Sequence, residues 1–494
     1  MTATATRNEI RFILNGLRVA LRDVRPDQTL LDYLRLARRL VGTKEGCAEG
    51  DCGACTVLVG RLSGDTIVYE GVNACIRFLA SLDGCHIVTI EHLKRPDGSL
   101  HPVQQAMVDC HGSQCGFCTP GIVMSLYALW MRNPQPTDMD IEKALQGNLC
   151  RCTGYEPIIR AARAISSYGN PASDPLALER ETVAAELKAM RDGMRVEIGA
   201  GRSRLVIPAN LDDLAATLEA EPNATIVSGS TDVGLWVTKF MREIAPAVFI
   251  GGLEELRTVS EQDGVITIGA GVSYSDAFSF LSTRIPSLSR LIDRIGGDQI
   301  RNMGTVGGNI ANGSPIGDMP PPLIALGATL TLRRGQSRRT IPLEEFFIAY
   351  GKQDRWPGEF VEAVHVPLPA PATRFAVWKI SKRRDEDITA VLGAFAVTFA
   401  PDGTVASARI AYGGMAATPK RALTVEAALA GKPWSMETIE QALPAYERDF
   451  APISDMRASA EYRMLAAKNL LRRFYLETTA AEQPVTIRRY EEAL

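Results

Sequence analysis

The ten cysteines of this chain are the residues whose type and placement most clearly indicate chemistry. All of them lie between Cys47 and Cys152, and the rest of the 494-residue sequence has none. In a reducing compartment, clustered cysteines favour metal binding over a disulfide framework. The sequence therefore predicts metal centres confined to the first third of the chain.

The first group of cysteines has the spacing of a plant-type [2Fe-2S] site. Cys47, Cys52 and Cys55 follow the pattern C-x4-C-x2-C, and Cys75 comes next as a fourth ligand. Glycines within this loop allow the tight turns that aim N–H groups at inorganic sulfides. The interval before Cys75 is shorter than in plant ferredoxins, so we expect a trimmed loop. A structural zinc site is the alternative.

The second group pairs Cys115 with Cys118 as C-x2-C, and Cys150 with Cys152 as C-x-C. Zinc sites usually take cysteine pairs spaced two to four residues apart, so C-x-C is uncommon for zinc. Each pair is predicted to precede a helix, one starting at Thr119-Pro120 and one at Thr153-Gly154, where the helix dipole stabilises thiolates. No histidine lies at Cys-x-His spacing, which excludes a Rieske centre. We predict a second all-cysteine [2Fe-2S] cluster.

Two cysteines are left over, Cys85 and Cys110, and a histidine follows each. The interpretation that the residues favour is a small buried side chain in a strand and in a helix, rather than a ligand or a redox group.

Two glycine-rich segments in the second half of the chain suggest a dinucleotide site. Residues 226–233 put a Gly-Ser-Thr turn after a short strand, where successive N–H groups can form an anion nest for a diphosphate. The turn is not a Walker motif, and no complete Rossmann fingerprint follows. Residues 301–318 gather small residues, hydroxyls and the Asp318 carboxylate. Either segment alone could be a structural loop, whereas the two together indicate a cofactor.

Composition and charge exclude several classes of protein. Hydrophobic residues make up 46% and charged residues 22% of the chain, as in folded globular domains. A net charge of -3 gives no electrostatic reason to expect a nucleic acid or an anionic membrane as partner. The first residues lack the apolar region of a signal peptide, and no apolar run approaches the ~18 residues of a membrane span. We expect a cytoplasmic protein without a membrane anchor.

Hydrophobic periodicity predicts the elements that hold these residues. Alternation around Asn15-Gly16 predicts a β-hairpin over 10–21, and helical spacing predicts a helix over 29–40. The other predicted elements are strands at 56–59, 66–69, 395–399 and 407–412, and helices from Thr119, from Thr137, after Gly154, and over 436–446 and 458–471.

The length favours about three domains, at roughly 150 residues each. Composition shifts and proline-rich breaks divide the chain into several α+β and helical units. The predicted boundaries are a first domain at 1–93, a helical domain at 94–167, a linker at 168–195, a third domain at 196–370 and a C-terminal domain at 371–494.

The cysteine spacings, together with Gln114–Gly121 (QCGFCTPG) and Asn148–Tyr155 (NLCRCTGY), resemble the molybdenum hydroxylase family, which includes xanthine dehydrogenases and aldehyde oxidases. The glycine-rich segments and Tyr412–Met415 resemble the FAD part of the same family and of carbon monoxide dehydrogenase flavoproteins. The resemblance implies a multidomain α+β protein: a β-grasp ferredoxin-like domain, a helical-bundle [2Fe-2S] domain, an FAD-binding domain of the PCMH type and a C-terminal domain of the carbon monoxide dehydrogenase flavoprotein type.

The resemblance also implies roles for single residues in the flavin domains. Ile295 stands where vertebrate relatives have phenylalanine, so aromatic stacking on the cofactor is not implied at that point. The charged run at 382–387 is either a solvated face or a nucleotide gate. The implied FAD-binding residues are Ile226, Val227, Ser228, Gly229, Ser230, Thr231, Asp232 and Val233 for the diphosphate, Thr305, Gly307, Gly308, Asn309, Asp318 and Val361 along the cofactor, and Lys379 near the flavin ring.

The implied activity is electron transfer within a purine-oxidising enzyme, and no residue of this chain is expected to hydroxylate the purine. A large molybdopterin-binding partner, in an (αβ)2 heterotetramer, would oxidise hypoxanthine or xanthine to urate. Electrons would pass to the Cys115 cluster, which Gln114 and Cys152 bring towards the pterin, then to the Cys47 cluster, FAD and NAD. A flavin belongs between clusters and NAD because it exchanges both single electrons and hydride.

Three alternatives stay open. The same module can serve an aldehyde or N-heterocycle hydroxylase, the chain can be a stand-alone NADH-flavin-iron–sulfur reductase, or it can be an iron–sulfur protein for sensing or scaffolding that needs no flavin.

Overall fold

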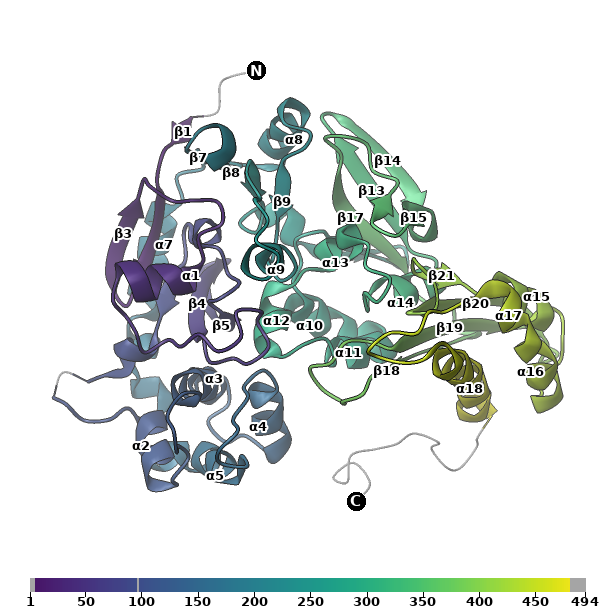
Figure 1. Cartoon of the computed structure of the whole chain (residues 1–494), viewed down its shortest axis with the longest axis horizontal. Helices are drawn as coiled ribbons and strands as arrows, with labels where there is room; N and C mark the ends of the chain where they lie inside the picture. The colour runs from purple at the N-terminus through teal and green to yellow at the C-terminus, as the bar shows by residue number, and fades with distance from the viewer. Residues whose placement is uncertain (1–4, 96, 480–494) are drawn as a thin grey trace.

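The computed structural model describes residues 5–95 and 97–479, and it has the multidomain α+β architecture that was predicted. The outermost residues of the predicted first and last domains, 1–4 and 480–494, lie outside the described part. Figure 1 shows the first and second units on the left, the third unit in the middle and the C-terminal unit on the right. Within the described residues, no helix combines the length and the apolar character needed to cross a membrane.

The first unit is a five-stranded β-grasp sheet in the order β3-β2-β6-β4-β5. The predicted hairpin is confirmed, because Asn15 and Gly16 both adopt positive φ between its strands. The predicted helix over 29–40 is wrong in part: α1 (Leu30–Asp32) continues as a π-helical turn over Tyr33–Ala37, and Arg39 then adopts a φ of 58°. The strands are β2 (Ile10–Leu14), β3 (Leu17–Leu21), β4 (Thr56–Ser63), β5 (Thr66–Asn73) and β6 (His86–Val88).

The second unit is a bundle of four helices below this sheet in Figure 1. The predicted start at Thr137 is confirmed, since its side chain and that of Asp140 form a capping box. The helices are α2 (Pro102–Asp109), α3 (Thr119–Arg132), α4 (Asp138–Leu145) and α5 (Glu156–Ala164).

The segment predicted as a linker, 168–195, is itself helical, with α6 (Pro175–Leu178) and α7 (Arg180–Met190). Apolar residues of α7, among them Leu187, pack on Ile13 and Leu62 of the first sheet. Asp174 is buried, and it accepts hydrogen bonds from His101 and Tyr127 of the helical bundle. The segment therefore fastens the second unit to the first.

The third unit contains two five-stranded sheets. The first has the order β1-β7-β8-β10-β9, so the short strand β1 (Thr6–Arg7) near the N-terminus joins a sheet formed mainly by residues after 194. Its other strands are β7 (Arg195–Ile198), β8 (Leu205–Ile207), β9 (Thr225–Val227) and β10 (Ala247–Phe249). The helices that accompany them are α8 (Leu211–Ala220) and α9 (Val233–Thr238).

The second sheet of this unit has the order β11-β12-β17-β13-β14. Its strands are β11 (Val259–Gln262), β12 (Val265–Gly269), β13 (Thr329–Arg334), β14 (Ser337–Pro342) and β17 (Phe360–Pro367), and a small hairpin joins β15 (Phe347–Ala349) to β16 (Lys352–Gln353). The helices are α10 (Tyr274–Arg284), α11 (Pro286–Ile292), α12 (Asp298–Met303), α13 (Val306–Asn312) and α14 (Pro320–Ala325).

The C-terminal unit is a four-stranded antiparallel sheet covered by helices, in the order β18-β19-β20-β21. The predicted strands and the last helix of this region are present, whereas the helix predicted over 436–446 is interrupted by a 3-10 turn at Leu443–Ala445. The elements are β18 (Thr373–Ile380), β19 (Val391–Phe399), β20 (Val405–Gly413), β21 (Lys420–Arg421), α15 (Leu423–Leu429), α16 (Met436–Ala442), α17 (Tyr446–Asp449) and α18 (Ala460–Thr479).

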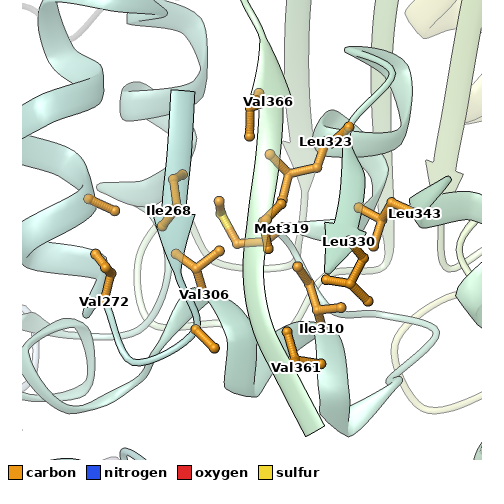
Figure 2. Packing of buried hydrophobic residues seen from close by; sticks show 14 of the residues in the cluster. Ile268, Val272, Val306, Ile310, Met319, Leu323, Leu330, Leu343, Val361 and Val366 are labelled. Carbon is orange, nitrogen blue, oxygen red and sulfur yellow. The ribbon is translucent and has the colours of Figure 1, made fainter. Parts of the chain in front are cut away.

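Shared apolar cores hold these units together. One core combines Phe12, Cys55 and Cys75 of the first unit with Val227 and Phe249 of the third. Another surrounds β17 of the third unit, where Figure 2 shows Val306, Ile310 and Met319 beside the strand, and it extends to residues of β19 and β20. Buried apolar area of this kind resists separation. The distances between sites in neighbouring units are therefore fixed by packing.

Candidate functional site

The first cysteine group converges on one point beside the β-grasp sheet. The Sγ atoms of Cys55 and Cys75 are 3.3 Å apart, and the thiol of Cys47 contacts those of Cys52 and Cys75. Backbone N–H groups of Glu49 and Cys52 donate to Cys47 Sγ at 3.5 and 3.4 Å. Such N–H···S bonds stabilise a thiolate.

The sulfur atoms of this group are close enough to perturb one another's ionisation. Hydrogen bonds from Cys52 and Cys75 lower the pKa of Cys47, while the hydrogen bonds to Cys47 raise the pKa of both Cys52 and Cys75. Four thiolates at this spacing repel one another unless cations lie between them. The donor set therefore fits a cluster of iron ions. In the described residues, no three His, Cys, Asp or Glu side chains are arranged as ligands of a single metal ion.

The second cysteine group also converges, at the outer edge of the helical bundle. The thiol of Cys118 contacts Cys150, and that of Cys152 contacts Cys115. Burial and the neighbouring Cys150 raise the pKa of Cys118 to about 12. Burial opposes ionisation of Cys150, yet hydrogen bonds from Thr153 lower its pKa. Cys115 and Cys152 are exposed, unlike Cys55 and Cys75.

One of the two predicted helix starts beside this group is confirmed. Helix α3 begins at Thr119, with Cys118 rather than Thr119 at its N-cap, and the Thr119 hydroxyl hydrogen-bonds Ser113. The predicted start at Thr153-Gly154 is wrong, since α5 begins at Glu156. Gly154 and Tyr155 both have a φ of 69°, which no right-handed helix tolerates. Only the first cysteine pair therefore lies directly at a helix N-terminus.

The two cysteine loops touch each other. The N–H of Leu149 donates to the carbonyl oxygen of Cys52 at 3.0 Å. A Cβ atom on Gly53, which has a φ of 65°, would lie 1.9 Å from the carbonyl oxygen of Gly147. A Cβ on Gly121 would likewise lie 2.1 Å from the carbonyl oxygen of Gly53. Glycine is required at this junction because the backbones are in direct contact.

The first cysteine loop also touches the third unit. Thr238 Oγ1 donates to the carbonyl oxygen of Ala48 at 2.6 Å, and Lys239 donates to that of Cys47. Both residues lie at the end of α9, the helix that begins directly after the predicted diphosphate turn. The contact thus links the candidate cluster loop with the candidate flavin site.

The predicted diphosphate turn has the features of an anion site. The turn follows β9, and Ser230 adopts a φ of 66°. Ser230 Oγ is buried, and it has no hydrogen-bond partner among the described residues. A Cβ on Gly229 would lie 1.8 Å from the carbonyl oxygen of Met303, so the turn is pressed against the end of α12. An orphaned hydroxyl beside a glycine turn fits a bound phosphate oxygen.

The second glycine-rich segment meets this turn through Thr305. Thr305 caps α13 through the N–H of Gly308, and its hydroxyl donates to Ser228 Oγ at 3.3 Å. Gly307 packs so tightly on Ala270 that a Cβ would lie 2.5 Å from it. One turn further along α13, Asn309 Oδ1 accepts the N–H of Met319. Helix α13 therefore connects the turn with the neighbourhood of Asp318.

Asp318 and Lys379 form a buried ion pair with a distance of 2.7 Å between Nζ and Oδ2. The hydroxyl of Thr389 donates to the other carboxylate oxygen. Tyr274 is buried close to both the pair and the turn, and its burial and the carboxylates of Asp232 and Asp318 raise its pKa well above the ordinary value. Burial also raises the pKa of Asp232. The sequence interpretation missed Tyr274 and Thr389, which are polar residues without a motif.

Other predicted residues lie apart from the turn. Val361 faces the apolar core beside Ile310 in Figure 2, and Ile295 is also buried. The prediction that Cys85 and Cys110 are buried in a strand and in a helix is wrong, because Cys85 precedes β6, Cys110 follows α2, and both are half-buried free thiols.

A large cavity of about 1020 Å³ opens beside the diphosphate turn, between the first and third units. Ser228, Gly229 and Thr305 line it on one side, and Arg61 and Arg77 line it on the other. Asp318, Val361 and Lys379 are not part of its wall. The predicted FAD residues thus form two groups joined by α13.

Four family models match the chain in sequence order. They describe a 2Fe-2S iron-sulfur cluster binding domain at 12–79, a [2Fe-2S] binding domain at 89–163, an FAD binding domain in molybdopterin dehydrogenase at 197–369 and a CO dehydrogenase flavoprotein C-terminal domain at 376–478.

Curated relatives match across nearly the whole chain. Xanthine dehydrogenase from Emericella nidulans is 32% identical over 94% of this chain and 38% of its own length. Aldehyde oxidase 1 from Bos taurus is 32% identical over 99% of this chain and 41% of its own length. The chain thus spans about two fifths of these relatives.

Solved structures match a little over half of this chain. Carbon monoxide dehydrogenase from Hydrogenophaga pseudoflava has a TM-score of 0.52 and 28% identity, over 54% of this chain and 93% of that chain. Quinoline 2-oxidoreductase from Pseudomonas putida 86 has a TM-score of 0.50 and 25% identity, over 55% of this chain and 94% of that chain. The chain belongs to the molybdenum hydroxylase family of oxidoreductases, in which it forms an electron-transfer module with two [2Fe-2S]-binding domains and one FAD-binding domain.

Proposed function

We propose that this chain carries electrons from a molybdopterin-binding partner through two [2Fe-2S] clusters to FAD and then to NAD. The observation that carries the proposal is an unbroken series of contacts between the candidate sites. The outer cysteine loop touches the inner one through Leu149 and Cys52, and the inner loop touches α9 through Ala48 and Thr238. Each site therefore has its next neighbour in the proposed order directly beside it.

The proposed cluster ligands divide into an inner and an outer set. Burial and N–H···S bonds, which help to set cluster potentials, differ between the two sets. The inner set consists of Cys47, Cys52, Cys55 and Cys75, and the outer set consists of Cys115, Cys118, Cys150 and Cys152. The exposed Cys115 and Cys152 give the outer set the position in which a partner's cofactor can approach it.

The proposed FAD site combines the orphaned hydroxyl of Ser230 with the ion pair of Asp318 and Lys379. When bound, FAD supplies the exchange between single electrons and hydride. The turn at 226–233, with Thr305, Gly307, Gly308 and Asn309, would hold the cofactor by its backbone and hydroxyl groups. Lys379 would supply a positive charge, which favours an anionic reduced ring.

The proposed partner is a large molybdopterin-binding subunit that oxidises hypoxanthine or xanthine to urate, in a cytoplasmic (αβ)2 heterotetramer. Four of the relatives with strong matches are xanthine dehydrogenases. An aldehyde or N-heterocycle substrate is the second candidate, because aldehyde oxidase 1 matches at the same 32% identity and quinoline 2-oxidoreductase matches the fold over 55% of this chain. In this proposal the partner subunit binds and oxidises the substrate, so the identity of the substrate depends on the partner.

The test is metal and flavin analysis of the natively purified complex, followed by assays with NAD. We expect about four irons and one FAD per chain, with molybdenum only in the partner. Xanthine should then drive NADH formation. Zinc at the cysteines or a colourless chain contradicts the whole proposal. NADH-driven reduction of acceptors by a chain that purifies without a molybdenum partner supports the stand-alone reductase instead.

A further inference from the structure

Gln299 lies where three units of the molecule meet. It belongs to α12 of the third unit, its side chain is 2% exposed, and it reaches between the two cysteine loops. Its amide nitrogen Nε2 lies 3.1 Å from Thr56 Oγ1, 3.2 Å from Ser125 Oγ and 2.9 Å from Asn148 Oδ1. The side-chain amide of Gln299, in the third unit, is thus hydrogen-bonded to residues of both the first and the second unit.

The acceptors of Gln299 are neighbours of proposed cluster ligands. Thr56 follows Cys55 in the inner set, and Asn148 precedes Cys150 of the outer set by two residues. Thr56 Oγ1 and Asn148 Nδ2 also donate to the carbonyl oxygen of Gly53, at 2.7 and 3.2 Å. A single network therefore fixes the backbone of both loops where they touch.

The packing around Gln299 is tight, and its amide oxygen is unpaired. A Cβ on Gly147 would lie 2.1 Å from Gln299 Oε1, and this oxygen has no hydrogen-bond partner among the described residues. An unpaired buried oxygen opposes folding, so an apolar side chain would fill the space at lower cost. The presence of an amide at this position is therefore better explained by the hydrogen bonds that its N–H groups make than by the space that the side chain fills.

We propose that Gln299 is a positioning residue for electron exchange between the two clusters, because its amide holds Thr56 and Asn148 in one network and so sets the gap between the inner and outer ligand loops. The inference rests on the proposed function, in which these loops carry the clusters. Gln299 touches no cofactor, and it acts through the residues beside the ligands.

The test compares the full wild-type chain, loaded with its cofactors, with the Gln299→Ala and Gln299→Glu variants. The flavin is reduced by a light flash with a photochemical donor, and freeze-quench EPR follows the electron to each cluster. We expect iron and flavin contents to stay at the wild-type level. Exchange between the clusters should slow at least severalfold, because the rate of electron transfer falls steeply as the gap between the two centres widens. The flavin-to-inner-cluster step should stay within about twofold of wild type.

Gln299→Glu keeps the shape of the side chain and removes the N–H donors, so it separates hydrogen bonding from volume. The matched control is Lys143→Met, which removes an ion pair between α4 and Asp293 of the third unit without touching the Gln299 network. The proposal is overturned by an unchanged exchange rate in both Gln299 variants, by equal slowing in the control, or by loss of iron from both variants, which makes Gln299 a folding residue. A wild-type chain without clusters, or without any exchange between them, refutes the proposed function instead.

Discussion

The two cysteine regions of this chain use similar proposed ligands but differ in how far these are exposed. In the inner region, Cys55 and Cys75 are almost fully buried in an apolar core that the first and third units share. In the outer region, Cys115 and Cys152 are exposed at the edge of the helical bundle. The more buried centre is better placed for exchange with centres inside the molecule, whereas the more exposed centre is open to a partner. This difference in exposure supports the proposed order of electron transfer, from the partner to the outer cluster and then to the inner cluster.

The largest effects are expected when one proposed ligand is removed from each region. Cys75→Ala and Cys115→Ala should each lower the iron content by about two atoms per chain. Cys75→Ala should also destabilise the fold by more than about 3 kcal/mol, because it removes a core side chain and a metal site coupled to folding. Iron analysis and thermal unfolding check both expectations.

Cys85→Ala is the control for these ligand variants, because Cys85 is a half-buried thiol outside both groups. It should retain all of the iron. Equal loss of thermal stability in Cys75→Ala and Cys115→Ala would show that the outer region is as tightly integrated into the fold as the inner one.

A second comparison uses two glycines of the loops, both in left-handed backbone. Gly53 has a φ of 65° and contacts Gly147, whereas Gly116 has a φ of 81° and open space around it, with no atom within 4 Å of the point that a Cβ would occupy. Gly116→Ala should cost about 1–2 kcal/mol, the penalty for a left-handed L-residue. Gly53→Ala should cost about 1–3 kcal/mol more, since the backbone of the neighbouring loop must move. Chemical denaturation measures both values, and equal losses contradict the close contact.

The closely spaced cysteines within each proposed ligand set could be predicted to lie together because their spacing is local in the sequence. C-x4-C-x2-C and C-x2-C define loops whose geometry depends mainly on the residues between the ligands. The hairpin at Asn15-Gly16 and the capping box at Thr137 were predictable for the same reason, since a turn or a cap is decided by adjacent residues. The correction at Glu156 concerns a helix boundary, where two left-handed residues, Gly154 and Tyr155, delay the start.

The contacts between units could not be predicted in this way. Gln299 meets Asn148 across 151 positions of sequence, and Thr389 meets Asp318 across 71. Neither polar residue lies in a motif, and each gains its role only when the units pack. The helical segment at 168–195 was likewise expected to be a linker, although its apolar face is buried against Ile13 and Leu62. A pattern within one segment does not say which other segment will cover it.

A third prediction concerns the carboxyl group of Glu386, whose pKa is affected by Asp51 of the inner loop. Burial, and then the neighbouring Asp51, raise the pKa of Glu386 to about 8. A carboxyl whose pKa is raised by folding is held in its neutral form, so folding stability should fall as the pH rises from about 4.5 to 8. Glu386→Gln removes this dependence, and it should be more stable than wild type at pH 8 by on the order of 1–3 kcal/mol. Thermal melts between pH 5 and 8 measure the difference. If the stability of both proteins changes with pH in the same way, the burial of the Glu386 carboxyl is contradicted.

The smallest effect is expected in the outer region, at Leu149. Its N–H donates to Cys52, but its side chain is 43% exposed. Leu149→Ala keeps the backbone hydrogen bond, so the stability of the isolated chain should change by less than about 0.5 kcal/mol. Exchange between the clusters should also stay at the wild-type rate. If the outer region faces the molybdopterin partner, the variant should bind that partner more weakly, because an exposed apolar side chain contributes mainly when a partner covers it. Titration of the partner against both proteins measures this loss of affinity. An unchanged affinity would show that the partner does not bind over Leu149.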